Sequence, residues 1–341
     1  MKYNRCGDSG VLLPAVSLGF WHNFGCTTPY ERSRDIALYA FNQGVVHFDL
    51  ANNYGPNPGD AESRLGQILR DDLKGHRDEL FISSKAAYDM WEGPYGIWAS
   101  RKHLMASLDQ SLQRMGLDYV DLFYCHRYDP ETPLDETLQC LVDIVRSGKA
   151  LYIGLSRWPL HAFQYGLRYL RQHDVPVLIF QDKLNILERE PVLGGILDEI
   201  SKYRLPSNEN ISIPSGLDKC EKLIPRPGFI SFSPLAQGLL TDRYLNGIPE
   251  GSRMTLEHFL KSSSLTDEML SKLHALNNLA TQRGESLAQM ALAWILHYPQ
   301  VTSVLVGASS VEQLKNNLKC IQSAPFSQEE LSIIDKIVQP S

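Results

Sequence analysis

The chain lacks the features of several large classes of protein. Its six cysteines are scattered over 341 residues and form no C-x-x-C pair, which indicates reduced thiols rather than a disulfide framework. No apolar run approaches the roughly 18 residues that a membrane-spanning helix needs. The N-terminus MKYNRCGDSG also lacks the apolar core of a signal peptide. We therefore expect a cytoplasmic protein with no membrane partner.

Basic charge and several catalytic motifs are also missing. The 33 Lys and Arg residues are outnumbered by 39 Asp and Glu residues, and the net charge of -6 argues against nucleic acid as a partner. A local basic pocket for a small anion remains compatible with this balance. The sequence has no G-x-S-x-G, no H-E-x-x-H and no paired-carboxylate motif, so hydrolysis is disfavoured and no metal site is predicted.

Eight short apolar runs are what the sequence does contain. They are near-continuous in apolar residues, the pattern of parallel strands covered on both faces. The runs are 15–20, 45–51, 80–86, 120–126, 150–156, 177–184, 229–235 and 301–307. Segments with helical periodicity separate them; one has Leu104, Leu108 and Leu112 on a single face and ends at Gly116.

Strand and helix alternating eight times predict an α/β fold, a (β/α)₈ TIM barrel formed by one domain over residues 1–341. Residues 1–13 predict an N-terminal β-hairpin that turns at GDSG and plugs the bottom of the barrel. An open doubly wound sheet is the alternative, disfavoured because no G-x-G-x-x-G follows the first strand. Residues 204–228, rich in Pro, Ser and Asn, are expected to form an irregular surface loop or insertion.

Four polar residues stand at the ends of successive predicted strands. Asp49, Lys85 and His126 end the second, third and fourth runs, and Tyr54 follows on the loop after the second. The carboxyl ends of barrel strands meet at one face, where active sites form. A buried Asp requires a partner, and Lys85 is the cation expected to pair with Asp49.

This set suits proton donation to a carbonyl oxygen that is becoming an alkoxide. A phenol has a pKa near 10, and a neighbouring ammonium is expected to lower the pKa of Tyr54. A neutral His126 can orient the carbonyl. The electrons would then come from a nicotinamide hydride. A Schiff-base role for Lys85, as in an aldolase-like barrel, is the competing interpretation.

A hydride carrier needs a site for its phosphates. Gly238 with Arg243 and Arg253 supplies one loop rich in suitable donors. Gly307 and Ser309 lie where the eighth strand gives way to a helix, whose N-terminal N–H groups bind phosphate well.

Several long motifs resemble the aldo-keto reductase superfamily, among them SLGFWHNFG, HFDLANNYGP, AYDMWEGPYG, SPLAQGLLTDRYLNGIP and VTSVLVGAS. Within it, they look most like the branch of bacterial glyceraldehyde 3-phosphate/methylglyoxal reductases and potassium-channel β-subunits. The resemblance implies that Tyr54 is the proton donor, that Asp49 and Lys85 tune it, and that His126 orients the substrate. It implies NADPH as the cofactor, with cofactor-binding residues Trp21, Asp49, Ser156, Arg157, Gln181, Phe232, Ser233, Pro234, Leu235, Gln237, Gly238, Leu239, Arg243, Arg253, Gly307, Ser309, Gln313 and Asn317.

The same resemblance implies a substrate pocket formed by Trp21, Tyr88, Trp91 and Arg127. The expected activity is NADPH-dependent reduction of small aldehydes such as glyceraldehyde 3-phosphate or methylglyoxal. A slow, NADPH-binding regulatory subunit is the alternative, favoured by Arg157 beside Ser156, a pair that the channel subunits share. A homo-oligomer, tetrameric or octameric, is expected by analogy only.

Overall fold

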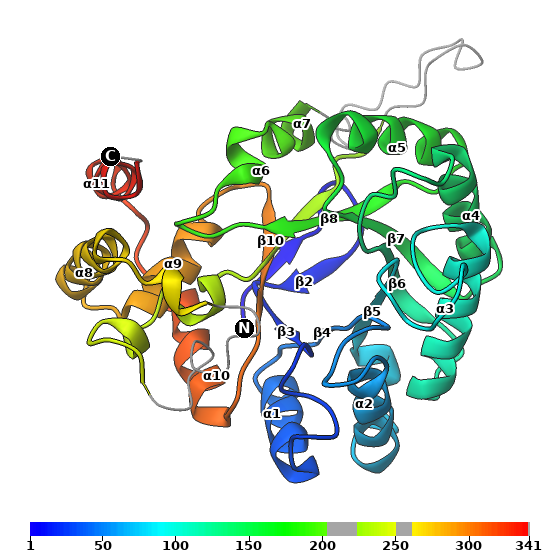
Figure 1. The fold of residues 1–341 in the computed structure, drawn as a ribbon, viewed down its shortest axis with the longest axis horizontal. Helices are drawn as coiled ribbons and strands as arrows, with labels where there is room; N and C mark the ends of the chain where they lie inside the picture. The colour runs from blue at the N-terminus through cyan, green and yellow to red at the C-terminus, as the bar shows by residue number, and fades with distance from the viewer. Residues whose placement is uncertain (203–223, 250–260, 340–341) are drawn as a thin grey trace.

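A closed barrel of eight parallel strands forms the centre of the molecule (Figure 1). The structure is a computed structural model that describes residues 1–202, 224–249 and 261–339. The strands are β3 (Val16–Gly19), β4 (His47–Asp49), β5 (Phe81–Ala86), β6 (Val120–Cys125), β7 (Ala150–Ser156), β8 (Val177–Lys183), β9 (Gly228–Phe232) and β10 (Val301–Val306). Strand β10 pairs with both β9 and β3, which closes the barrel. The predicted barrel is confirmed, and the open sheet is wrong.

Helices surround the strands as an outer ring (Figure 1). They are α1 (Tyr30–Asn42), α2 (Asp60–Asp71), α3 (Arg101–Met115), α4 (Leu134–Arg146), α5 (Leu160–Gln172), α6 (Glu190–Leu193), α7 (Ile196–Lys202), α8 (Asp267–Gln282), α9 (Leu287–Leu296), α10 (Val311–Leu318) and α11 (Gln328–Val338). Helix α3 shows how local sequence sets them. The Ser100 side chain accepts a hydrogen bond from the His103 N–H, and Gly116, at φ 68°, ends the helix.

The predicted N-terminal hairpin closes the end of the barrel opposite the carboxyl ends of the strands. It consists of β1 (Tyr3–Arg5) and β2 (Leu12–Pro14), and Figure 1 shows it across the centre of the ring. Leu13 and Cys6 are fully buried and pack in one apolar cluster with barrel residues such as Leu178. The Asn4 side chain donates to the Thr302 carbonyl at 2.9 Å. The hairpin therefore leaves only the other end open for a site.

Most of the predicted loop 204–228 lies outside the described residues, which resume at 224. Its Arg226 is described and contacts the hairpin: the Arg226 N–H donates to the Asp8 carboxylate at 2.8 Å and the guanidinium pairs with it at 3.1 Å. Within the described ranges, no helix is long and apolar enough to cross a membrane.

Gly66 marks a close approach of α2 to the end of α3. A Cβ at this position would lie 2.4 Å from the Arg114 carbonyl oxygen and 2.9 Å from the Met115 Cα, and backbone atoms cannot rotate away. We expect Gly66→Ala to lower the free energy of unfolding by about 1–3 kcal/mol. Gly75→Ala is the matched control, because nothing lies within 4 Å of a Cβ there. Equal denaturation midpoints for the two variants would contradict this packing.

Candidate active site

A fully buried ion pair lies at the open end of the barrel. The ammonium of Lys85, on β5, donates to Asp49 Oδ2, on β4, and both side chains have 0% exposure. The same Nζ donates to the Leu50 carbonyl at 2.7 Å and lies 3.4 Å from the Tyr54 hydroxyl. The cation predicted for Asp49 is therefore present. Because the three donors of the ammonium face three oxygens and none faces solvent, the geometry argues against a Schiff-base role for Lys85.

Tyr54 and His126 complete the group of four. The loop after β4 holds Tyr54 through its own backbone: Tyr54 N–H donates to the Ala51 carbonyl at 3.0 Å. The rings of Tyr54 and His126 meet edge to face with their centroids 5.6 Å apart, and Tyr88 packs on the other side of His126 at 4.7 Å. The sequence placed these residues at neighbouring strand ends, and the structure brings them into contact.

The imidazole of His126 is neutral and has an unused polar atom. Burial, with Lys85, Arg157 and Arg127 nearby, holds the pKa of His126 well below its usual value. Its Nδ1 is buried and has no hydrogen-bond partner within the described part of the chain. Such an orphan is costly unless something occupies the space beside it, which fits a substrate or cofactor oxygen at this point.

The phenol of Tyr54 titrates in the direction opposite to the one expected from the sequence. Burial raises the pKa of Tyr54 well above its ordinary value, and the negative charge of Asp49 adds to the rise. The expected lowering by Lys85 is wrong as a net effect. The reason is that the ammonium is already paired with Asp49, and burial lowers the pKa of Lys85 itself. Tyr54 therefore holds its proton throughout the physiological pH range.

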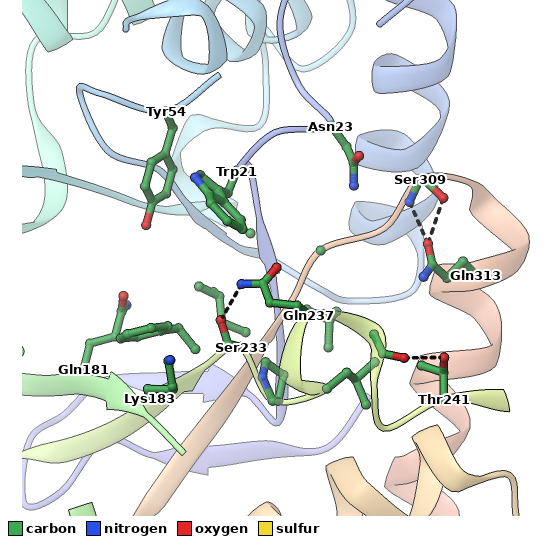
Figure 2. Close-up of a pocket in the computed structure, with 18 of the residues that line it drawn as sticks. Trp21, Asn23, Tyr54, Gln181, Lys183, Ser233, Gln237, Thr241, Ser309 and Gln313 are labelled. Carbon is green, nitrogen blue, oxygen red and sulfur yellow. Dashed lines mark hydrogen bonds between the residues drawn. The ribbon is translucent and has the colours of Figure 1, made fainter. Parts of the chain in front are cut away.

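A cavity of about 850 Å³ opens beside these residues (Figure 2). In Figure 2, Tyr54, Trp21 and Gln181 lie at one end of the cavity and Ser309, Gln313 and Thr241 at the other. The predicted residues that line it are Trp21, Tyr54, Tyr88, His126, Arg157, Gln181, Phe232, Ser233, Pro234, Leu235, Gln237, Gly238, Arg243, Gly307, Ser309 and Gln313.

Some lining residues were not predicted. They are Gly19, Asn23, Asn53, Lys183, Thr241, Leu305 and Val306. Gly19 ends strand β3 and Val306 ends strand β10. The prediction from the sequence considered the carboxyl ends of three strands only, and considering all eight strand ends would have included both residues. Asn23 and Thr241 lie on loops, where no sequence signal distinguished them.

Other predicted residues lie behind the cavity wall. Ser156, Leu239 and Asn317 are buried, and Asp49 and Lys85 lie beneath Tyr54. Trp91 and Arg127, which were expected in the substrate pocket, do not line this cavity, and their role in binding substrate stays a prediction.

Aromatic packing accounts for both displaced side chains. The Trp91 ring packs against His103 with centroids 4.9 Å apart. The Arg127 guanidinium lies over Trp98 at 4.0 Å and over Tyr88 at 4.3 Å. Arg253 lies outside the described residues.

The wall between the two ends contains strained backbone. Three lining residues, Arg157 (φ 55°), Ser233 (φ 49°) and Gln237 (φ 60°), adopt the left-handed region without being glycine, and so does Ala236 (φ 46°) beside Gln237. The last two lie in the short 3₁₀ helix η4 (Ala236–Gly238), and Gln237 Nε2 donates to Ser233 Oγ at 3.4 Å. Non-glycine residues persist in this region mainly at sites that bind something.

Polar groups at the cavity fit a dinucleotide. Arg157 and Gln181 line the cavity and carry groups that can bind an amide such as a nicotinamide carboxamide. Ser156 Oγ is buried beside Arg157 in the sequence and has no partner among the described residues. At the far end, Ser310 caps α10 by accepting from the Gln313 N–H, while the Gln313 side chain accepts from the N–H of Ser309 at 2.8 Å (Figure 2). Helix α10 thus presents its N-terminus to this end.

A closed parallel barrel with Tyr54, Lys85, Asp49 and His126 clustered at its open end fits an oxidoreductase. The family model "Aldo/keto reductase family" matches residues 15–198 and 217–339. The chain belongs to the aldo/keto reductase family.

The relatives match almost the whole chain. An L-glyceraldehyde 3-phosphate reductase of Escherichia coli O157:H7 is 49% identical over 98% of this chain and 92% of its own length. A probable voltage-gated potassium channel subunit beta of Oryza sativa subsp. japonica is 33% identical over 99% and 95%. The crystal structure of a thermostable aldo-keto reductase, Tm1743, in complex with the inhibitor epalrestat, superposes with a TM-score of 0.70 at 27% identity, covering 99% of this chain and 100% of that one.

The raised pKa of Tyr54 has a direct spectroscopic consequence. We expect the phenolate absorbance of the wild type and of Tyr54→Phe to follow the same curve up to about pH 10, because the Tyr54 phenol stays protonated over that range. The measurement is a pH titration of both proteins by ultraviolet difference absorbance. A wild-type tyrosine that ionises near neutral pH and is absent from the variant would show that the Lys85 charge outweighs burial.

Proposed function

We propose that the protein catalyses the NADPH-dependent reduction of small aldehydes to alcohols. The observation that carries this proposal is the meeting of the Tyr54 hydroxyl, the Lys85 ammonium and the neutral His126 at one end of the cavity. These are the groups needed to hold a carbonyl oxygen and to give it a proton.

Tyr54 is the proposed acid. Its hydroxyl faces the cavity, and the Lys85 Nζ lies 3.4 Å behind it, so the ammonium stabilises the phenolate that forms as the proton leaves. A ring nitrogen of His126 holds the carbonyl oxygen in line with that proton. Because the imidazole is neutral rather than an imidazolium, Tyr54 stays the acid beside the substrate. The high pKa of Tyr54 keeps it protonated until negative charge develops on the oxygen.

NADPH is proposed as the cofactor, and it supplies a hydride to the carbonyl carbon when bound. Arg157 and Gln181 on the cavity wall, with Ser156 buried behind it, would hold its carboxamide, and Phe232 on the wall offers a ring for stacking. Arg243 lines the far part of the cavity beside Thr241, where a 2′-phosphate requires a cation.

The substrate is proposed to be a small polar aldehyde, such as glyceraldehyde 3-phosphate or methylglyoxal. The 49% identity to an L-glyceraldehyde 3-phosphate reductase supports this choice. The guanidinium of Arg157 lines the cavity and suits a phosphorylated substrate, whereas the ammonium of Lys183, also on the wall, is paired with Glu188 at 2.8 Å. The homo-oligomer expected by analogy stays a prediction.

A regulatory subunit with slow turnover is the second candidate. Arg157 favours it, since its guanidinium lines the cavity beside the reacting end and donates to the Tyr88 hydroxyl at 3.0 Å. The 33% identity to a probable potassium channel subunit also supports it. A survey of turnover across aldehydes at saturating NADPH separates the two, because a sensor is slow on all of them.

Removal of the Tyr54 hydroxyl tests the mechanism. We expect Tyr54→Phe to lower kcat for aldehyde reduction by roughly 10²–10⁴-fold and to leave NADPH affinity nearly unchanged, because only the proton donor is lost. Steady-state kinetics and fluorescence titration with NADPH measure the two effects. Unchanged turnover in this variant would refute the assignment of Tyr54.

The cofactor preference tests the far end of the cavity. We expect Arg243→Ala to weaken NADPH binding by roughly 10-fold and NADH binding hardly at all, because only NADPH carries the phosphate that Arg243 would bind. Arg168→Ala, an exposed change on α5, is the control. Equal losses for NADPH and NADH would place Arg243 elsewhere in the site.

A further inference from the structure

A line of polar side chains crosses the barrel interior beneath the ion pair. Ser303 on β10, Ser17 on β3, His47 on β4 and Ser83 on β5 all have 0% exposure. Ser303 Oγ lies 2.6 Å from Ser17 Oγ, which lies 2.7 Å from His47 Nδ1. His47 Nε2 lies 3.0 Å from Ser83 Oγ, and Ser83 Oγ donates to Asp49 Oδ1 at 2.7 Å. A buried chain of polar groups is costly unless every member has a hydrogen-bond partner, and here each of the four side chains has one.

The carboxylate fixes the direction of every hydrogen bond in this chain. An ionised Asp49 can only accept, so the Ser83 hydroxyl donates to it and its oxygen accepts from a His47 Nε2–H. Burial lowers the pKa of His47 to about 4, so its imidazole is neutral and carries a single N–H. Nδ1 is then an acceptor for Ser17, and Ser17 in turn accepts from Ser303. All the protons point toward Asp49.

The two oxygens of Asp49 are held from opposite sides. Oδ1 accepts from Ser83 and, at 3.2 Å, from Gln181 Nε2, while Oδ2 accepts from Lys85. The rotation of the carboxylate therefore decides where the ammonium stands relative to Tyr54. No group of the chain Ser303–Ser17–His47–Ser83 lines the cavity, so none of these side chains touches the substrate.

We propose that Ser83 and His47 are positioning residues that hold the Asp49 carboxylate so that Lys85 stands beside the Tyr54 hydroxyl. The effect of Ser83 and His47 on turnover rests on the proposed function. The positioning of Asp49 itself rests only on the directions of the hydrogen bonds. Ser17 and Ser303 act one step further away by satisfying His47 Nδ1, the acceptor nitrogen of that tautomer. Without the Ser83 donor, the charge on Asp49 is less compensated, draws the ammonium from Tyr54, and leaves the phenol a weaker acid.

The experiment uses two adjacent serines of β5. Ser83 faces the chain, whereas the Ser84 hydroxyl donates to Glu62, which pairs with Arg114 outside the barrel. Both are fully buried, so Ser84→Ala is a matched control for Ser83→Ala. We expect Ser83→Ala to lower kcat by roughly 10-fold and to change KM and the NADPH dissociation constant by less than about 2-fold. Ser83→Thr keeps a hydroxyl at this position, and we expect it to retain most of the wild-type kcat.

The pH dependence of turnover is a measurement that a general loss of stability would not change. In alcohol oxidation the base would be the small fraction of Tyr54 that is phenolate, so turnover rises with pH below the raised pKa of Tyr54 without reaching a plateau. We expect this rising limb to lie at higher pH in Ser83→Ala but not in Ser84→Ala. Other titratable or charged groups also face Asp49 and Tyr54, and none of them is substituted in either alanine variant. They are His47, Lys85, Tyr88, Tyr124, His126 and Arg157. Equal losses in the two alanine variants, or an unchanged profile in Ser83→Ala, would overturn the proposal.

A second measurement does not depend on activity. Nitrogen-15 spectra of the histidine side chains, with His47 assigned by its loss in His47→Gln, should show a neutral Nε2–H tautomer at pH 7. An imidazolium or an Nδ1–H tautomer would overturn the proposal even in an active enzyme. If the wild type reduces no aldehyde but shows this tautomer, the proposed function fails while the hydrogen-bond directions stand.

Discussion

The buried ion pair of Asp49 and Lys85 is the constraint on which the active end depends. Two charges with no exposure lose their hydration, and a pair of this kind is tolerated only when further hydrogen bonds satisfy its remaining oxygens and protons. Here the Leu50 carbonyl, Ser83 and Gln181 supply them. The parallel sheet can hold these partners together because Asp49 lies in register with Ser83 on the neighbouring strand and Gln181 comes from another barrel strand.

The cavity combines two environments with different demands. At the reacting end, burial keeps Tyr54 protonated and His126 neutral, so that charge develops only when a substrate oxygen needs it. Along the wall between the two ends, Ser233 and Gln237 line the cavity with left-handed backbone. The reacting end therefore holds the groups suited to proton transfer, and the wall holds groups suited to binding a ligand. This division is compatible with the aldo/keto reductase family, to which the chain belongs.

Much of the fold and part of the site could be predicted from the sequence. Eight apolar runs separated by helical periods leave few arrangements other than a barrel, because each face of a parallel sheet must be covered. The strand ends then identified Asp49, Lys85 and His126 without knowledge of side-chain packing. Trp91 and Arg127 show the limit: a motif placed them near the pocket, and stacking on His103 and Trp98 moved them away from it.

The sequence by itself determined the barrel, its plugged end and the residue types that meet at the open end, since local periodicity and the parallel topology suffice for these. Only the tertiary structure decided the direction in which Tyr54 titrates. That direction depends on how completely the phenol is buried and on whether the Lys85 charge is already engaged. It also brought Ser17, His47, Ser83 and Ser303 into one chain, because four strands far apart in sequence face a common interior.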